Sequence, residues 1–206
     1  MGGSSIAGIR AFVAILLPDD VRSALDAEIE QLRPVGRDVS WVARDNLHVT
    51  LKFLGHVAPE RLDLAVSALA RVAATVAGFE LAIAGLGAFP SPTRPRVLWA
   101  GLTSGADAAA TLARSIDRAL AAHGFAREDR PFSGHVTLGR VRQPGRDERL
   151  AAALAAGARH QFGRLAVDRL ALMRSELSPR GARYSITSAW PLLAAPSQGT
   201  TTAVAR

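Results

Sequence analysis

The pattern of apolar and polar positions predicts strands and helices that alternate along the chain. Short apolar runs that stop at proline or glycine predict strands, whereas apolar residues three or four positions apart predict helices. Residues 8–17 form a run of the first kind, which Pro18 ends. Val21, Leu25 and Ile29 follow at helical spacing. The same criteria predict further strands over residues 39–42, 47–54, 79–89, 96–102, 162–174 and 183–190, and further helices over residues 59–76, 106–123 and 146–156.

The order of these elements predicts two similar halves that meet near Thr103. Each half contains a strand, a helix and further strands. Several successive strands have short links, which favours antiparallel pairing over a doubly wound parallel sheet. We therefore expect an α+β fold that arose by internal duplication, with a pseudo-two-fold axis and a pocket between the halves.

Length and composition indicate one domain in a reducing compartment. The chain has 206 residues, 49% of them apolar, which suffices for one large domain or two small lobes. It contains no cysteine, which excludes disulfides, thiolate metal sites and a cysteine nucleophile and fits the cytoplasm. Apolar runs do not reach the roughly 18 residues that cross a bilayer, and the first residues do not resemble a signal peptide. We expect a monomer with one domain over residues 1–194 and a disordered tail over residues 195–206.

The basic residues are nearly all arginine. The formal net charge is +7, and Lys52 is the only lysine. Guanidinium groups bind phosphate through two parallel hydrogen bonds, so a phosphate-rich partner is one explanation. The codon usage of a GC-rich genome, which favours Ala, Arg and Gly, explains the same composition equally well. Composition leaves both explanations open.

A four-residue word occurs twice in the chain, and each copy begins with one of the five histidines. The word His-Val-Thr-Leu starts at His48 and again at His135. Because alternate side chains of a strand point to the same face, each histidine shares a face with the threonine two residues later, Thr50 or Thr137. The valine and leucine of each word then point to the opposite face, which we expect to be the core. Two such strands side by side would bring two imidazoles and two hydroxyls into one pocket.

Two imidazoles in one pocket can perform acid–base chemistry without a metal or a cofactor. The unperturbed pKa of histidine is about 6.5, so one ring can accept a proton while the other donates one. Each such transfer typically accelerates a reaction by about 10²–10⁴. A phosphodiester with a strained ring or an adjacent hydroxyl suits this arrangement, because threonine hydroxyls can hydrogen-bond to its non-bridging oxygens.

Three other interpretations of the histidines compete with this one. A single His-x-Thr pair on a strand is usually an ordinary surface or core pair, and only the presence of two identical words favours function. A metal site lacks support, because Asp45, Glu128 and Asp129 precede the words without an established ligand spacing. A serine hydrolase would need a Gly-x-Ser-x-Gly sequence, which is missing. The remaining histidines are expected at the surface or in loops: His56, His123 and His160.

Around both words the chain resembles the two-histidine phosphoesterase superfamily, in particular the bacterial and archaeal RNA 2′,3′-cyclic phosphodiesterases, also called 2′-5′ RNA ligase-like proteins. The resemblance runs from about Arg10 to Leu192, and its two words are specific only as a pair. The matching segments are residues 10–14, 41–42, 46–55, 87–90, 94–99, 130–132, 135–140, 175–178 and 181–184.

The resemblance implies a bilobal α+β fold in which two antiparallel sheets face a central cleft, with the helices on the outside. It also implies metal-independent hydrolysis of RNA 2′,3′-cyclic phosphate ends to 2′-phosphomonoesters, with weak 2′-5′ ligation in the reverse direction. His48 would donate a proton to the departing 3′ oxygen, and His135 would be the base that activates water. Thr50, Thr137 and Arg140 would hold the phosphate.

Additional residues are candidates for lining the cleft. Arg130 and Arg183 are also explained as solvated or ion-paired residues, and Phe12, Phe53 and Trp99 are more readily explained as core residues than as stacking partners for a base. The family often has proline immediately before the second histidine, where this chain has Gly134, so we expect a less rigid entry to that strand. The additional candidates are Phe12, Phe53, Arg130, Ser175 and Tyr184.

Two other functions compete with RNA cyclic phosphodiesterase. One is a non-catalytic RNA-binding or nucleotide-binding module, which the presence of both histidines disfavours. The other is the same chemistry on a small nucleotide, such as a cyclic phosphate of ADP-ribose. Assays that compare oligonucleotide with mononucleotide substrates separate these functions.

Overall fold

The computed structural model describes residues 8–178 and 181–194, which form strands, α-helices and two short 3₁₀ helices. The expected tail, residues 195–206, lies outside the described residues. The strands are β1 (Ile9–Leu16), β2 (Val39–Trp41), β3 (His48–Val57), β4 (Phe79–Phe89), β5 (Val97–Leu102), β6 (His135–Val141), β7 (Gln161–Val167), β8 (Arg169–Ser178) and β9 (Gly181–Pro191). The α-helices are α1 (Asp19–Leu32), α2 (Pro59–Ala73), α3 (Ala106–Ala121) and α4 (Glu148–Ala156).

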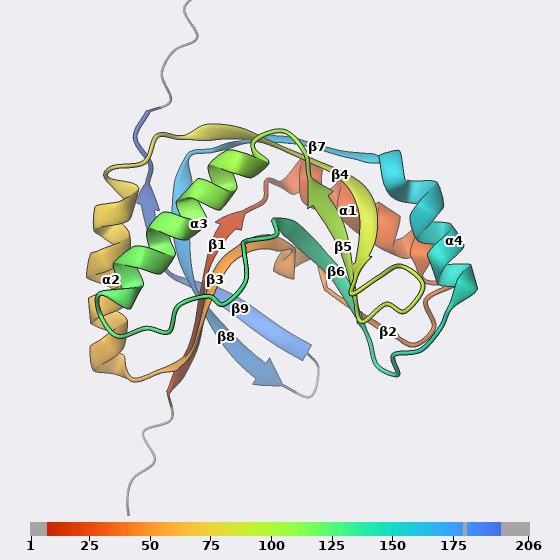
Figure 1. Cartoon of the computed structure of the whole chain (residues 1–206), viewed down its shortest axis with the longest axis horizontal. Helices are drawn as coiled ribbons and strands as arrows, with labels where there is room; N and C mark the ends of the chain where they lie inside the picture. Colours follow the sequence, from red (N-terminus) through yellow and green to blue (C-terminus); the bar gives the residue numbers. More distant parts are fainter. Residues whose placement is uncertain (1–7, 179–180, 195–206) are drawn as a thin grey trace, which may run out of the picture.

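The strands of the described chain belong to one curled, nine-stranded antiparallel sheet (Figure 1). Hydrogen-bonded neighbours follow the order β7-β4-β5-β6-β3-β1-β8-β9, and β2 pairs with β6 beside this path. The predicted α+β class is confirmed. The structure differs from the prediction of two separate sheets, because the two parts are joined where β3 meets β6 at the residue pair Val49 and Val136.

The two lobes do not correspond to the two halves of the sequence. One lobe contains β1, β3, β8 and β9, with α2 and α3 packed against it (Figure 1). The other contains β4, β5, β6 and β7, with α1 against β7 and α4 against β4. The C-terminal hairpin β8–β9 therefore completes the lobe that begins with β1. None of the described helices is long and apolar enough to cross a membrane.

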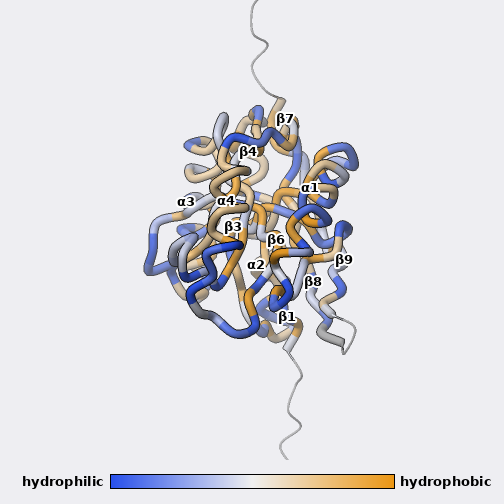
Figure 2. Tube along the Cα trace, turned by 90° about the vertical axis from the view of Figure 1, so that its right-hand side faces the viewer, coloured by the Kyte–Doolittle hydropathy of each residue, from blue (hydrophilic) through white to orange (hydrophobic). Residues whose placement is uncertain are grey.

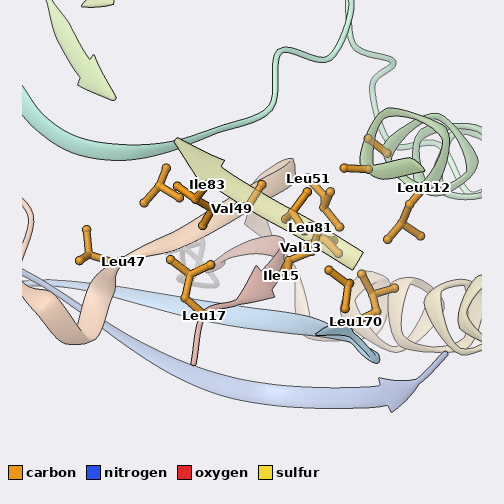
Figure 3. Packing of buried hydrophobic residues seen from close by; sticks show 14 of the residues in the cluster. Val13, Ile15, Leu17, Leu47, Val49, Leu51, Leu81, Ile83, Leu112 and Leu170 are labelled. Carbon is orange, nitrogen blue, oxygen red and sulfur yellow. The ribbon is translucent and has the colours of Figure 1, made fainter. Parts of the chain in front are cut away.

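One continuous apolar core lies between the sheet and the helices. Alternate residues of the central strands enter it, among them Val13 and Ile15 of β1 and Val49 and Leu51 of β3 (Figure 3). Figure 2 shows hydrophobic residues along the inner strands and hydrophilic residues in the outer turns and loops. Full burial of one such side chain contributes about 1.5–3 kcal/mol, so this packing fixes which face of β3 stays open. The predicted core faces of both words are confirmed.

β3 contains a bulge directly after Thr50. Thr50 pairs with Ala14 of β1, and the next paired residue is Lys52, which leaves Leu51 as the extra residue. A bulge shifts the alternation of side chains along its strand by one position. Lys52 therefore turns to the helix side of the sheet, where it is 3% exposed, and Phe53 turns to the open side, where it is 57% exposed.

β6 contains the same bulge after its own threonine. Thr137 pairs with Trp99 of β5, the next paired residue is Gly139, and Leu138 is left as the extra residue. Gly139 therefore turns to the helix side and Arg140 to the open side. The bulge brings Arg140 onto the face of Thr137, although strict alternation would have placed it on the opposite face.

One predicted strand, residues 162–174, is two strands in the structure. β7 ends at Val167 and β8 begins at Arg169, with Asp168 between them. β7 pairs with β4 and β8 pairs with β1, so the chain changes lobe at this point. Both strands bury apolar residues, and the apolar pattern therefore continues through the break.

Candidate active site

The two His-Val-Thr-Leu words lie side by side where the lobes join. β3 and β6 run antiparallel, and the valines of the two words are paired. In an antiparallel pair, the residue before a paired position on one strand lies opposite the residue after that position on the other strand. The histidine of each word therefore lies next to the threonine of the other word. The valines are buried in the core, so the histidines and threonines point to the open face. These open-face residues are His48, Thr50, His135 and Thr137.

His48 is held in one tautomer by a neighbouring carbonyl. Its Nδ1 lies 2.7 Å from the backbone oxygen of Asn46, which can only accept, so Nδ1 carries a proton. Asn46 donates from Nδ2 to the carbonyl of Ala182 at 2.7 Å, which ties this turn to β9. The second nitrogen, Nε2, lies 2.9 Å from the hydroxyl of Thr50. Nε2 is therefore the ring nitrogen of His48 that could exchange a proton with a bound molecule.

His135 is held in the same way. Its Nδ1 lies 2.7 Å from the backbone oxygen of Ser133, so this nitrogen also donates. In both words the accepting carbonyl belongs to the residue two positions before the histidine. Gly134 allows the segment before β6 to pack closely, since a Cβ there would lie 2.5 Å from Leu102 Cδ1. The expected loosening at Gly134 is therefore opposed by close packing.

The pKa values of both histidines are lowered from the ordinary value of 6.5. Burial is the largest cause in each case, because it disfavours the charged ring, and the backbone hydrogen bonds oppose it. A charge on His135 lowers the pKa of His48 further, and the charge of Arg140 lowers the pKa of His135 further. The two rings are thus close enough that one disfavours the protonation of the other.

Aromatic side chains enclose His48. Phe12 of β1 stacks on the imidazole with ring centres 4.7 Å apart, and Tyr184 of β9 contacts it edge-on at 5.4 Å. Phe12 is 3% exposed, so its position is fixed by packing. Sequence analysis identified both aromatic residues as candidates, and the structure brings both to the histidine.

A hollow of about 170 Å³ opens beside this aromatic cluster. Ser175 is buried in its wall opposite Tyr184 in the β8–β9 hairpin, and Phe53 lies 6.0 Å from Phe12. The predicted additional residues Phe12, Phe53, Ser175 and Tyr184 thus share one hollow. Its lining consists of Arg10, Ala11, Phe12, Phe53, Gly55, Ser175 and Tyr184.

A second aromatic pair lies against His135 and was not identified from the sequence. Phe89 contacts the imidazole edge-on at 5.1 Å, and Trp99 lies 5.4 Å behind Phe89. Trp99 rests flat on Gly87, where a Cβ would come within 2.3 Å of the indole. Trp99 was expected in the core, but it lies on the face of Thr137, its partner across β5 and β6. The glycine opposite Trp99 in β4 is the sequence signal that could have indicated this contact.

The predicted arginines differ in their relation to the histidines. Arg140 follows the second word in β6, faces the same side as Thr137 and acts electrostatically on His135. Arg130 and Arg183 are exposed, and in the described part of the chain neither forms a hydrogen bond or ion pair with a histidine. Of the two predicted site arginines, Arg140 and Arg130, the structure therefore brings only Arg140 close to a histidine of the two words.

The other histidines lie outside the site, as expected. His56 and His160 are exposed, and His123 is half-buried at the end of α3. His160 Nδ1 lies 3.0 Å from the carboxylate of Glu28 on α1. Within residues 8–178 and 181–194, we find no group of three or more His, Asp or Glu side chains that could hold a metal ion.

The sequence is similar to those of a known family and of its members. The sequence matches the family model described as LigT like Phosphoesterase over residues 15–99 and 102–184. It is 32% identical over 177 residues to the RNA 2′,3′-cyclic phosphodiesterase of Methanothermobacter thermautotrophicus, an alignment that covers 86% of this chain and 95% of that protein.

Two crystal structures are similar to the whole fold. The structure of TT0787 of Thermus thermophilus aligns with a TM-score of 0.75 and 30% identity, over 89% of this chain and 98% of that chain. The structure of E. coli LigT complexed with 3′-AMP aligns with a TM-score of 0.72 and 27% identity, over 90% of this chain and 98% of that chain.

Proposed function

The chain belongs to the family of LigT-like phosphoesterases within the two-histidine superfamily, and from this membership we propose that it hydrolyses the 2′,3′-cyclic phosphate ends of RNA. The observation that carries the proposal is the antiparallel pairing of the two words. This pairing places two imidazoles on one open face, each with Nδ1 occupied by a carbonyl and Nε2 left for proton exchange. A cyclic phosphate between the two Nε2 atoms would meet one acid and one base.

In this reaction His135 is the base and His48 is the acid. His135 Nε2 accepts a proton from water as the water oxygen attacks phosphorus. The bond between phosphorus and the 3′ oxygen breaks, and His48 Nε2 donates its proton to that oxygen. The product carries a 2′-phosphomonoester and a free 3′ hydroxyl. The charge of Arg140 beside His135 supports this assignment, because it favours the neutral ring that a base requires.

The anionic phosphate completes the protonation pattern. Burial lowers the pKa of His48 in the free protein, whereas an anion within a few ångströms favours the charged ring. Substrate binding therefore raises the pKa of the acid at the moment when its proton is needed. Thr50 and Thr137 donate hydrogen bonds to the non-bridging oxygens, and Arg140 neutralises their charge in the transition state.

The hollow beside His48 binds the nucleoside. Its aromatic wall, Phe12, Phe53 and Tyr184, suits the face of a base, and Ser175 offers a hydroxyl. Arg130, which is exposed ahead of β6, contacts the RNA backbone beyond the terminal nucleotide. If the 5′ hydroxyl of another RNA takes the place of water, the same proton transfers form a bond between that 5′ oxygen and phosphorus and break the bond to the 3′ oxygen, which predicts a weak 2′-5′ ligation.

One assay tests the function directly. Nucleoside and oligonucleotide 2′,3′-cyclic phosphates are incubated with the protein in excess chelator, and the product is identified by phosphorus NMR. We expect turnover and a 2′-phosphomonoester. A 3′-phosphomonoester would contradict the assigned leaving group, and tight binding without turnover would indicate a binding module. Faster turnover of mononucleotides than of oligonucleotides would indicate a small-nucleotide substrate.

A further inference from the structure

We propose that Lys52 is a positioning residue that holds the segment leading to His135, and this inference rests on the proposed function. Lys52 belongs to β3, two residues after Thr50, but the bulge at Leu51 turns it away from the cleft. Its side chain is 2% exposed and reaches toward α3. The residue thus connects the strand of one histidine with the approach to the other.

The ammonium group of Lys52 has three acceptors. Nζ donates to Oδ1 of Asp117 on α3 at 2.7 Å and to the backbone carbonyl of Ala126 at 2.8 Å. The third acceptor is Oε1 of Glu128 at 3.5 Å. An ammonium group has three N–H donors, so each donor has a partner. This match allows a charged group to be buried, because an unpaired ammonium in the same place would be strongly destabilising.

Asp117 binds the same segment from its other side. Its Oδ1 also accepts from the backbone N–H of Glu128 at 3.1 Å, and its Oδ2 accepts from Nε of Arg127 at 2.9 Å. Lys52 and Asp117 therefore hold three consecutive residues, 126–128, through both backbone and side-chain atoms. Residues 125–134 contain neither helix nor strand, so these bonds replace the ladder of a regular element.

The anchored segment ends at the carbonyl that orients His135. Ser133, whose backbone oxygen accepts from His135 Nδ1, follows the anchored residues 126–128 by a few positions. If residues 126–128 were released, the carbonyl of Ser133 could move. The imidazole of His135 would then turn, and its Nε2 would point in another direction. A displacement of about 1 Å at a reacting group can cost on the order of 100-fold in rate. His48 takes its carbonyl from Asn46, which is bonded to β9 instead, so the anchor acts on one histidine only.

The test replaces Lys52 with methionine in the full chain, since Lys52→Met keeps the length and removes the charge. We expect kcat to fall about 10- to 100-fold, with a much smaller change in KM. Histidine side-chain NMR should show a changed Nδ1–H signal and titration for His135, with those of His48 retained. A folded variant with unchanged kcat and unchanged His135 signals would overturn the proposal.

Two further variants keep the result interpretable. Lys52→Met combined with Asp117→Leu removes both buried charges, so it avoids an uncompensated carboxylate if the single variant does not fold. We expect the same loss of kcat and the same His135 signals from it, and wild-type values would overturn the proposal. Glu28→Gln is the control in the other lobe, where it replaces the carboxylate that lies 3.0 Å from His160 Nδ1. It should lower thermal stability without changing kcat or the His135 signals.

The NMR readout separates this proposal from the proposed function. If the wild-type chain does not hydrolyse cyclic phosphates, the function fails, while the effect of Lys52→Met on His135 still tests the anchor. If the wild-type chain is active and His135 is indifferent to Lys52→Met, the anchor fails and the function stands. Isotope labelling of lysine gives a single side-chain ammonium signal, which belongs to Lys52, because the chain contains one lysine. This signal reports directly on the anchor in the wild-type protein.

Discussion

The strand that carries His48 and the strand that carries His135 are built alike for four positions and then diverge. In both, Nδ1 donates to the carbonyl two residues earlier, and a bulge follows the threonine. The residue that follows the bulged leucine is Lys52 in β3 but Gly139 in β6. At Gly139 a Cβ would meet Val39 at 2.5 Å, because β2 pairs there, whereas Lys52 faces α3. The surroundings of the two strands therefore explain where their sequences differ.

The residues that follow Lys52 and Gly139 also differ, and this difference affects the surroundings of the two histidines. Phe53 follows Lys52 and faces the aromatic hollow, whereas Arg140 follows Gly139 and lowers the pKa of His135. Both histidines thus have aromatic neighbours, but His135 in addition lies in the field of a cationic side chain, Arg140. Different environments for two like groups are how one site obtains both an acid and a base.

Removal of either imidazole should have the largest effect and should be equal for the two strands. His48→Ala and His135→Ala should each reduce kcat by about 10²–10⁴, because each removes one proton transfer. The double variant should be little worse than either single variant, since the two groups act as a unit. Steady-state kinetics with circular dichroism as a folding control checks this. Additive losses would show that the histidines act independently.

The threonines should reveal the first difference between the strands. Under the proposed function, Thr50→Ala and Thr137→Ala each remove a donor to the phosphate. A hydrogen bond to a charged group contributes about 1.5–3 kcal/mol, so we expect a loss of roughly 10- to 100-fold in kcat/KM. Of these two threonines, Thr50 alone has a hydroxyl within hydrogen-bond distance of a histidine in the described structure, at 2.9 Å from His48 Nε2. We therefore expect Thr50→Ala to move the limb of the pH profile that belongs to His48. Serine at each position is the matched control, and an equal pH effect from Thr137→Ala would remove the distinction.

The aromatic contacts should contribute less and should act locally. Phe12→Leu removes the ring stacked on His48, and Phe89→Leu removes the ring edge against His135. Contacts of this kind contribute about 0.5–1.5 kcal/mol, so we expect kcat to change by about 2- to 10-fold. NMR titration of the imidazoles should show that each variant perturbs mainly its own histidine. Perturbation of both rings by either variant would mean that the two clusters are coupled.

The pH dependence of an Arg140 variant should distinguish the surroundings of His135 from those of His48. The pKa values of both histidines are lowered, so both limbs of a bell-shaped kcat/KM profile should lie on the acid side of 6.5. Removal of the positive charge by Arg140→Gln raises the pKa of His135. Less of the base is then neutral at acid pH, and the acidic limb should move to higher pH. Because the rings interact, the limbs describe the pair. An acidic limb that does not move would place Arg140 outside the field of His135.

Local patterns predicted much of the fold and of the site. Most predicted strands and helices lie within a few residues of their observed bounds, because apolar periodicity reflects burial directly. The same reasoning failed at Asp168, where an apolar pattern continues from β7 into β8 although the chain changes lobe. It also wrongly placed Trp99 in the core. Trp99 packs closely on Gly87 because β4 pairs with β5, and a local pattern does not reveal that pairing. Periodicity cannot report which strand lies next to which.

The sequence alone determined the two words, the face of each strand that carries His48, Thr50, His135 and Thr137, and the family resemblance that follows from them. Alternation along an extended backbone is a local property, and a few residues suffice to establish it. Only the tertiary structure decided that β3 and β6 meet at their valines, that both strands bulge after threonine, and that Lys52 is buried against α3. These features arise from contacts between segments far apart in the chain, where burial and hydrogen bonding override local alternation.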